Sequence, residues 1–297
     1  MIQNILEEKL KPKAYSSDIP SRWCPGCGDF GVTNALSRAF SENLLDQERT
    51  VIVSGIGCSS RLPLWMGPYG FHTLHGRALP VAAGIKISHP ELDVLVTMGD
   101  GDCFSIGGNH YPPVMRRNFD LTAIVMDNHT YGLTKNQCSP TSQVGYPGTL
   151  SPVGNVDEPM NVLGLAVANG ATFVAQTFSG KPKHVMQMVE AGMKHRGFAF
   201  INVLSPCVTF NKLETFEYWK ERVVEVPEGH DTSDKIAAWK LSEEGMRGNG
   251  LPMGILYQTT RPTYSDQVAM VKEKLHSVPA NELDMEAIFD SLTPGRK

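Results

Sequence analysis

Five short segments of the chain are almost continuously apolar and rich in β-branched residues, at 50–53, 93–98, 121–126, 171–175 and 198–204. Continuous rather than alternating apolarity is typical of strands that are buried on both faces of a parallel sheet. Segments with helical periodicity lie between or beside them, at 30–43, 78–88, 106–117, 160–169 and 182–196. This alternation predicts an α/β fold with a doubly wound, mostly parallel sheet flanked by helices.

The pattern changes after residue 210. Aromatic and charged residues follow, and then Pro and Gly interrupt a weak periodicity between 227 and 263. We therefore expect two parts, a domain at 1–210 and an irregular C-terminal extension at 211–297 that lies over this domain or over a partner chain.

Composition excludes several classes of protein. The 27 basic and 31 acidic side chains of the 297 residues give a net charge of 27 − 31 = −4, which offers nucleic acid little basic surface. No apolar run approaches the roughly 18 to 20 residues that cross a bilayer, and the N-terminal sequence is not a secretory signal. We expect a cytoplasmic protein with neither a nucleic-acid nor a membrane partner.

Polar motifs follow four of the predicted strands. They are SGIGCSSR at 54–61, GDGDCF at 99–104, DNHTYGLTKNQ at 127–137 and SPC at 205–207. Open α/β sheets bind ligands at the carboxyl ends of their strands. The motifs therefore predict one shared site at that edge.

The Gly99-Asp100-Gly101 motif favours a diphosphate with a metal ion. Its glycines let the backbone approach a phosphate, and a helix start near 106–109 would offer free N–H groups. Asp100 and Asn128 supply the oxygens that Mg²⁺ prefers, and residues 102–127 lie between the GDG motif and Asn128. An ordinary turn is the alternative, but this spacing of 26 residues resembles the thiamine diphosphate motif. The resemblance implies that Asp100, Asn128 and the main chain of Thr130 hold the metal.

The pair Cys24 and Cys27 allows several interpretations. A redox-active dithiol is one, and a structural zinc site is another, although only one C-x-x-C pair is present. A [4Fe–4S] cluster is the third, with Cys58 and Cys207 as further thiolates. Cys103 and Cys138 also fall near the predicted edge, and free cysteines also pack well in a core.

Six motifs in order resemble the β subunit of 2-oxoacid:ferredoxin oxidoreductases, most of all those acting on 2-oxoglutarate. They are WCPGCG at 23–28, GIGCSSR at 55–61, GFHTLHGRALPVAAGIK at 70–86, GDGDCFSIGGNH at 99–110, DNHTYGLTKNQCSPTS at 127–142 and SPC at 205–207. The match spans about residues 15 to 225. The resemblance implies that the 1–210 domain binds thiamine diphosphate and that Cys24, Cys27, Cys58 and Cys207 hold one [4Fe–4S] cluster. Cys103 and Cys138 would be neighbours of the cofactor.

The resemblance also implies which residues line the cofactor site. They are Ile56, Gly57, Cys58, Ser59, His75, Gly76, Gly99, Asp100, Gly101, Asp102, Asn128, Thr130, Tyr131, Gly132 and Leu133. Leu133 would also line the substrate pocket. His72 and His75 form H-x-x-H, but the family assigns His75 to the cofactor and not to zinc.

The implied activity is the CoA-dependent oxidative decarboxylation of 2-oxoglutarate to succinyl-CoA, with electrons passing singly through the cluster to ferredoxin. The β subunit would be active only with its α subunit, and the reaction is reversible in some relatives. Arg61 is the candidate for the distal carboxylate of 2-oxoglutarate, because a guanidinium binds carboxylates bidentately. Lys135 or an arginine of the partner are alternatives for that role.

Two other functions remain open from the sequence. The same enzyme class could act on pyruvate or on a broad range of 2-oxoacids. In a different class, the chain would be a non-catalytic α/β binding module stabilised by zinc or a cluster.

Overall fold

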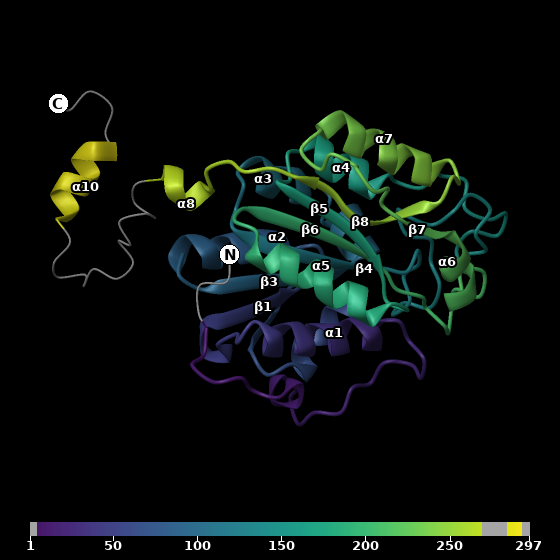
Figure 1. Cartoon of the computed structure of the whole chain (residues 1–297), viewed down its shortest axis with the longest axis horizontal. Helices are drawn as coiled ribbons and strands as arrows, with labels where there is room; N and C mark the ends of the chain where they lie inside the picture. The colour runs from purple at the N-terminus through teal and green to yellow at the C-terminus, as the bar shows by residue number, and fades with distance from the viewer. Residues whose placement is uncertain (1–4, 269–283, 293–297) are drawn as a thin grey trace.

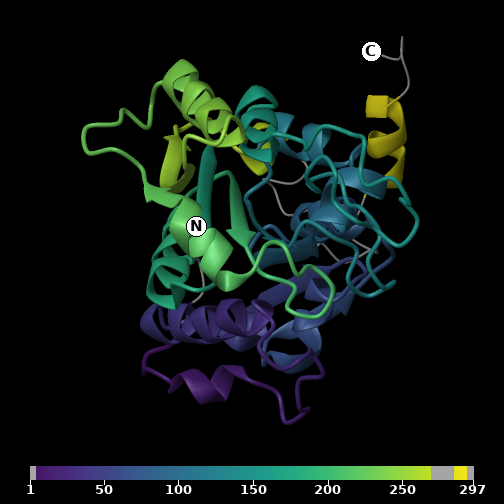
Figure 2. The same ribbon diagram turned by 90° about the vertical axis from the view of Figure 1, so that its right-hand side faces the viewer.

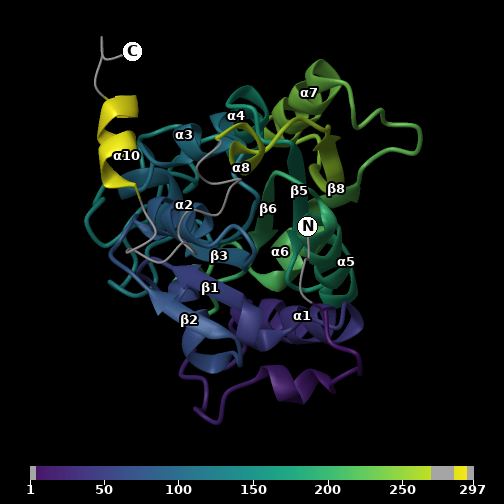
Figure 3. The ribbon, with the colours of Figure 1, turned by 90° about the vertical axis from the view of Figure 1, so that its left-hand side faces the viewer.

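A computed structural model describes residues 5–268 and 284–292 of the chain. Within these residues an eight-stranded sheet has the order β2-β1-β3-β4-β6-β5-β8-β7. The strands are β1 (Thr50–Ser54), β2 (Tyr69–His72), β3 (Asp93–Gly99), β4 (Leu121–Asp127), β5 (Phe173–Phe178), β6 (Phe198–Leu204), β7 (Val223–Glu225) and β8 (Leu251–Gln258). All neighbouring pairs are parallel except β5 and β8, so the predicted doubly wound α/β fold is confirmed. Figure 3 shows β2 and β8 toward opposite sides of the sheet.

Helices cover both faces of the sheet (Figure 1). They are α1 (Asp29–Glu42), α2 (Ala78–Ser88), α3 (Tyr111–Arg116), α4 (Val162–Ala168), α5 (Pro182–Lys194), α6 (Phe216–Arg222), α7 (Lys235–Met246), α8 (Tyr264–Gln267) and α10 (Met285–Leu292). Helices α1 and α5 pack on one face, where Phe40 and Val189 are buried, and α2, α3 and α4 pack on the other. Every residue of the central strands β4 and β6 is buried, which explains their continuous apolarity.

The segment after β3 differs from the prediction. We expected one helix at 106–117, but the chain forms a π-helical turn at Gly101–Ile106, and α3 begins only at Tyr111. Gly107 ends this turn, and a side chain on it would lie 2.4 Å from the carbonyl oxygen of Asp102, so the close packing there requires glycine. Pro112 then stands at the start of α3, where proline is tolerated. The free N–H groups expected at 106–109 therefore belong to a helix start near Gly101 instead.

The C-terminal extension contains more regular structure than its sequence pattern indicated. Strand β8 pairs antiparallel with β5, and α7 packs on α4. Asp234 caps α7 by accepting hydrogen bonds from the backbone of Ile236 and Ala237. The predicted strand at 171–175 begins later, at Phe173. Residues 223–258 thus continue the same sheet, and residues 269–283 and 293–297 of the predicted extension lie outside the described residues.

Hydrogen bonds hold the segment after β8, at Arg261 and Pro262, against the core. The buried amide of Asn118 donates to the carbonyls of Arg261 and Pro262 and accepts from the backbone N–H of Phe198. The Arg261 guanidinium donates to main-chain carbonyls at the ends of α3 and α4. Carbonyls at helix ends lack partners within the helix, so this arginine stabilises both ends.

No helix of the described residues is long and apolar enough to cross a membrane.

The buried His195 predicts an acid-sensitive fold. This residue is 8% exposed, and its Nε2 lies 2.8 Å from the Thr172 hydroxyl. Burial lowers the pKa of His195 to about 4, against ~6.5 in an unfolded chain. The folded protein therefore prefers the neutral ring, and this contribution is complete above about pH 6.5 and is lost as the pH falls toward 4.

We expect the free energy of unfolding to fall between pH 7 and pH 4.5 by about 2 kcal/mol more in the wild type than in His195→Gln. Urea unfolding at several pH values measures this difference. Parallel pH profiles for the two proteins would mean that His195 is not the titrating group.

Candidate functional site

The carboxyl ends of β1, β3, β4 and β6 lie at one edge of the sheet, because these neighbouring strands are parallel and in register. The four polar motifs follow these strands. Figure 2 views the molecule from the side where the loops after β4 (teal) and β6 (green) gather. The structure thus brings the four motifs to one edge, as the sequence predicted.

Asp100 follows β3, and it is 2% exposed. The hydroxyl of Thr141 donates to its Oδ2 over 2.8 Å. Burial and the neighbouring Asp127 raise the pKa of Asp100 to about 7. A bound cation would lower the cost of an ionised Asp100, because it offsets both burial and the like charge.

Asn128 and Thr130 form a tight turn after β4. The amide oxygen of Asn128 accepts from the backbone N–H of Thr130 over 3.1 Å, and His129 between them has a φ of 58°. This left-handed conformation is uncommon outside glycine and is found at functional sites. The turn therefore holds two of the predicted metal ligands in one fixed unit.

Gly101 lets the loops after β3 and β4 meet. A Cβ at this position would lie 2.1 Å from the ring of Tyr131, whose hydroxyl donates to the Gly101 carbonyl over 3.2 Å. The glycine next to Asp100 is therefore required for a close approach to Tyr131.

The side chain of His129 carries a buried positive charge. Its Nδ1 lies 2.9 Å from Glu214 Oε1, and its Nε2 lies 3.6 Å from Asp127 Oδ1. Burial lowers its pKa, but the two carboxylates outweigh burial and raise the pKa to about 10. The imidazolium therefore balances part of the acidic charge beside Asp100.

Asp102 joins three loops of the candidate site. Its carboxylate accepts from the backbone N–H of Ile56 over 3.2 Å, from that of Gly76 over 2.6 Å and from the hydroxyl of Ser60 over 3.0 Å. His75 Nδ1 lies 2.7 Å from the same carboxylate. Asp102 therefore holds the loops after β1 and β2 in place, a role that its motif alone did not indicate.

The thiols of Cys58 and Cys207 both lie close to Gly132. A Cβ on this glycine would lie 3.8 Å from the sulfur of Cys58 and 3.4 Å from that of Cys207. Both thiols therefore border this glycine. Cys27 lies close by, because the N–H of its neighbour Gly28 donates to the carbonyl of Pro206 over 3.1 Å.

The Trp23 side chain holds the N-terminal cysteine pair against the loop after β1. Its indole N–H donates to the Cys58 carbonyl over 2.7 Å, and its ring packs edge-on against Trp65 at 4.3 Å. Cys24 is exposed, whereas Cys27 and Cys58 are partly buried. The structure thus brings the four predicted cluster cysteines to one region of the molecule.

The electrostatics of these thiols reflect burial and their mutual proximity. Burial, Asp29 and the thiols of Cys207 and Cys24 raise the pKa of Cys58 to about 11, against a smaller opposing effect of Arg61. The pKa of Cys27 is raised for similar reasons. Thiolates in such a place need a cation to be stable.

Among the described residues, no group of three or more His, Cys, Asp or Glu side chains is placed to hold a metal ion. An iron–sulfur cluster is larger than one ion and is held by four thiolates, and two of the four candidate thiols border Gly132.

The other two cysteines lie apart from this group. Cys103 is buried in the core beside α2 and α3. The Cys138 thiol lies 3.3 Å from the Ser151 hydroxyl and 2.6 Å from the position of a Cβ on Gly148. Cys103 lies three residues after Asp100, whereas Cys138 lies in the long segment after β4, so the two cysteines have different surroundings.

The two predicted substrate residues lie near the cysteines. Arg61 is half-buried and stacks on the ring of Trp65 at 5.3 Å, and its backbone N–H donates to the Cys58 carbonyl. No carboxylate of the described residues forms an ion pair with Arg61. Leu133 is 48% exposed and follows Gly132. Both residues are thus accessible beside the thiols.

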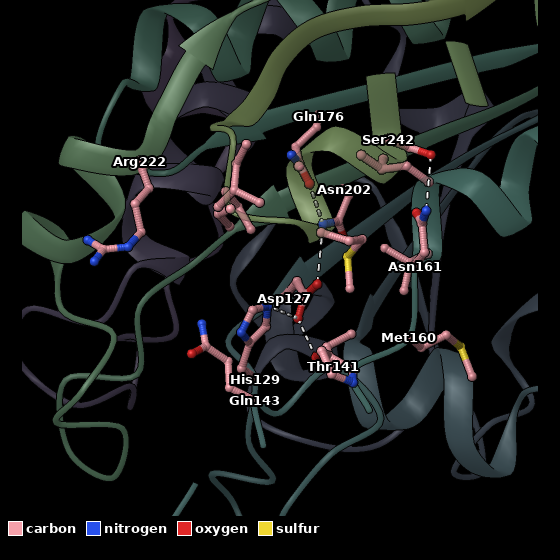
Figure 4. A pocket seen from close by; sticks show the side chains of 18 of the residues that line it. Asp127, His129, Thr141, Gln143, Met160, Asn161, Gln176, Asn202, Arg222 and Ser242 are labelled. Carbon is pink, nitrogen blue, oxygen red and sulfur yellow. Dashed lines mark hydrogen bonds and ion pairs between the residues drawn. The ribbon is translucent and has the colours of Figure 1, made fainter. Parts of the chain in front are cut away.

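A cavity of about 460 Å³ lies next to Asp127, between the carboxyl ends of β4, β5 and β6 and the C-terminal helices (Figure 4). Its inner wall includes Gln176 and Asn202, and its rim includes Arg222. The Asn202 amide donates to Asp127 Oδ2 over 3.2 Å and to the side-chain oxygen of Gln176 over 3.1 Å. Asp127 and Thr141 both line the cavity, and the Thr141 hydroxyl hydrogen-bonds both Asp127 and Asp100. Asp100 therefore lies one side chain away from the cavity.

Four residues of the site, Thr141, Ser142, Glu214 and Asn202, were not expected from the sequence. The first two stand in the CSPTS segment, whose hydroxyls could have been noticed beside the acidic motif. Glu214 and Asn202 act through contacts across 75 to 85 positions of the chain, which no local pattern reveals.

Comparisons with known proteins agree with this arrangement. Residues 55–203 match the family model described as thiamine pyrophosphate enzyme, C-terminal TPP binding domain. Residues 207–273 match the model for the C-terminal part of the pyruvate ferredoxin oxidoreductase beta chain. The boundary between the two matches falls just after β6.

Whole-length relatives are also found. The chain is 41% identical to 2-oxoacid:ferredoxin oxidoreductase 1, subunit beta, of Aeropyrum pernix, over 86% of this chain and 84% of that protein. It is 35% identical to the 2-oxoglutarate synthase subunit KorB of Methanocaldococcus jannaschii, over 87% and 95%. A solved 2-oxoglutarate:ferredoxin oxidoreductase from Magnetococcus marinus, with 2-oxoglutarate, coenzyme A and succinyl-CoA bound, is 43% identical with a TM-score of 0.91 over 99% of this chain and 100% of that chain.

Proposed function

Because the chain belongs to the family of 2-oxoacid:ferredoxin oxidoreductase β subunits, we propose that it serves the CoA-dependent oxidative decarboxylation of 2-oxoglutarate to succinyl-CoA. Family membership confirms the predicted oxidoreductase over the non-catalytic binding module. The solved relative with 2-oxoglutarate and succinyl-CoA bound supports this choice of substrate.

Thiamine diphosphate would bind at the edge formed by the loops after β1, β2, β3 and β4. Asp100, Asn128 and the main chain of Thr130 would hold Mg²⁺, since they offer the hard oxygens that this ion prefers. Gly99 and Gly101 would leave room for the diphosphate. When bound, thiamine diphosphate would supply the carbanion chemistry for decarboxylation of the 2-oxoacid.

Cys24, Cys27, Cys58 and Cys207 would hold one [4Fe–4S] cluster, which passes electrons singly to ferredoxin. The observation that carries the proposal is the meeting of Cys58 and Cys207 around Gly132, in the same loop as Asn128 and Thr130. Electrons leaving the substrate would thus have a short path. Ile56, Gly57, Ser59, His75, Gly76, Asp102, Tyr131 and Leu133 would complete the walls of the cofactor site.

A β subunit requires its α subunit for activity, and we propose that the extension at 211–297 contributes to their contact. We also place the complex in the cytoplasm. The deciding experiment is anaerobic co-purification with the α subunit, followed by dye reduction with CoA and a panel of 2-oxoacids. Reduction with 2-oxoglutarate and CoA supports the proposal, whereas faster reduction with pyruvate would favour the broader enzyme class.

Arg61 carries the prediction on substrate choice. A charge-assisted hydrogen bond contributes roughly 1.5 to 3 kcal/mol, so Arg61→Ala should lower kcat/KM for 2-oxoglutarate by roughly ten- to a hundredfold. Pyruvate has no distal carboxylate and should lose much less. Steady-state dye reduction with both acids measures the ratio.

The alternative roles of Arg61 give different outcomes. An equal loss with both acids would mean that Arg61 supports the Cys58 loop, which its stacking on Trp65 would explain. No loss with either acid would leave Lys135 or a cation of the α subunit to bind the distal carboxylate. Lys135→Ala tests the other cation suggested for this role, and a loss confined to 2-oxoglutarate in that variant would assign the distal carboxylate to Lys135.

A further inference from the structure

We propose that the hydroxyl of Thr141 positions Asp100 for the metal, by bridging Asp100 and Asp127. This inference rests on the proposed function of Asp100 as a ligand of Mg²⁺. Thr141 Oγ1 lies 2.8 Å from Asp100 Oδ2 and 2.8 Å from Asp127 Oδ1, and all three residues are buried. In Figure 4 the Thr141 side chain points toward Asp127 at the inner end of the cavity.

The first part of the argument concerns the orientation of a carboxylate. Mg²⁺ demands near-ideal octahedral geometry, so a carboxylate ligand has to present one oxygen in a fixed direction. The bond from Thr141 to Oδ2 of Asp100, together with a side-chain hydrogen bond from Ser139, limits rotation of the carboxylate and holds it in one orientation. Partners of this kind typically change metal affinity by roughly ten- to a hundredfold.

The second part concerns charge. A hydroxyl has one proton to donate, and an ionised carboxylate only accepts. Thr141 therefore serves one of its two acids at a time, while Asp127 also receives the amide of Asn202 and the charge of His129. Because Asp127 has these other partners, the proton of Thr141 is available to Asp100.

The same segment also supports the second group of ligands. The Ser142 hydroxyl donates to the carbonyl of His129 over 2.6 Å, between Asn128 and Thr130. It also accepts from the backbone N–H of Ser139 over 2.8 Å, and the Asn155 amide donates to the Ser142 carbonyl over 2.9 Å. Residues 139–142 are thus braced internally and contact the metal-ligand loops of both β3 and β4. This accounts for the CSPTS motif, to which the proposed function assigns no role.

Four residue types at position 141 separate the hydroxyl from the methyl group. Thr and Val have nearly the same shape and differ in the hydroxyl, and Ser and Ala differ in the hydroxyl without the methyl. In the α–β complex stripped of cofactor, calorimetric titration with thiamine diphosphate and Mg²⁺ should show affinities roughly ten- to a hundredfold weaker for Thr141→Val and Thr141→Ala. Thr141→Ser should stay within about threefold of the wild type. Cluster absorbance should not change.

Thr149→Val is the matched control, because the Thr149 hydroxyl bonds the Lys135 carbonyl in an exposed part of the same loop. Equal weakening in Thr141→Ser and Thr141→Ala would mean that packing of the methyl group matters, and it would overturn the proposal, as would unchanged affinity in Thr141→Val. If Thr141→Val does not fold, the Ser and Ala pair gives the same comparison. If Asp100→Ala leaves cofactor affinity unchanged, the proposed metal site itself fails, which distinguishes that failure from the failure of this inference.

Discussion

Replacement of Asp100 by alanine is expected to abolish Mg²⁺-dependent binding of thiamine diphosphate. Asp100 is the one charged side chain among the three proposed ligands, and loss of a supporting partner alone would weaken metal binding by roughly ten- to a hundredfold. Loss of the ligand should therefore weaken binding by more than about a hundredfold. Calorimetry on the α–β complex measures this affinity.

Asp100→Asn tests the charge separately, because it keeps the shape of the side chain. We expect it to bind the cofactor almost as poorly as Asp100→Ala, while the iron content stays at the wild-type level. Asp157→Ala is the matched control, since Asp157 is an exposed acid in the long segment between β4 and α4. Wild-type cofactor affinity in Asp100→Ala would rule out the assignment of the metal site.

The second large effect is expected at Cys207. Cys207→Ser should remove or degrade the [4Fe–4S] cluster, because serine offers no thiolate and Cys207 stands with Cys58 beside Gly132. The protein purified without oxygen should lose its brown colour and most of its ~4 iron and ~4 sulfide per chain. Cys24→Ser should act in the same direction, and electron transfer to a dye should be lost with the cluster.

Cys138→Ser is the control for this experiment. Its thiol contacts Ser151 and lies apart from the four clustered cysteines, so iron and sulfide should remain at the wild-type level. Bound zinc without sulfide in the wild-type protein would contradict the cluster. Full iron content in Cys207→Ser would instead mean that another cysteine supplies the fourth thiolate.

The strongly apolar strands were predictable from the sequence. β3, β4 and β6 are buried along almost their whole length, so continuous apolarity identified them without ambiguity. β2 was missed because each of its four residues is exposed, and β8 because Pro252 and Gly254 interrupt its pattern. Partial burial at the sides of a sheet leaves a weak periodicity in the sequence.

The candidate site was predictable where its residues follow strands directly. Asp100, Asn128 and Cys207 follow strand ends, and the rule for parallel sheets brings such positions together. Thr141 was not predictable, because it reaches Asp100 through an irregular loop. The charge on His129 likewise depends on Glu214, which lies 85 positions further along the chain.

The antiparallel pairing of β5 with β8 has a consequence for synthesis on the ribosome. The other neighbour of β5 is complete once residue 204 has emerged, but β8 follows about fifty residues later. Synthesis at ~5–20 residues per second leaves the outer edge of β5 without its partner for several seconds. An unpaired strand edge is a template for aggregation. The nascent chain therefore needs chaperone protection in that interval. A chain truncated near residue 240 would lack β8 and would be expected to aggregate, although it already contains the loops of the cofactor site.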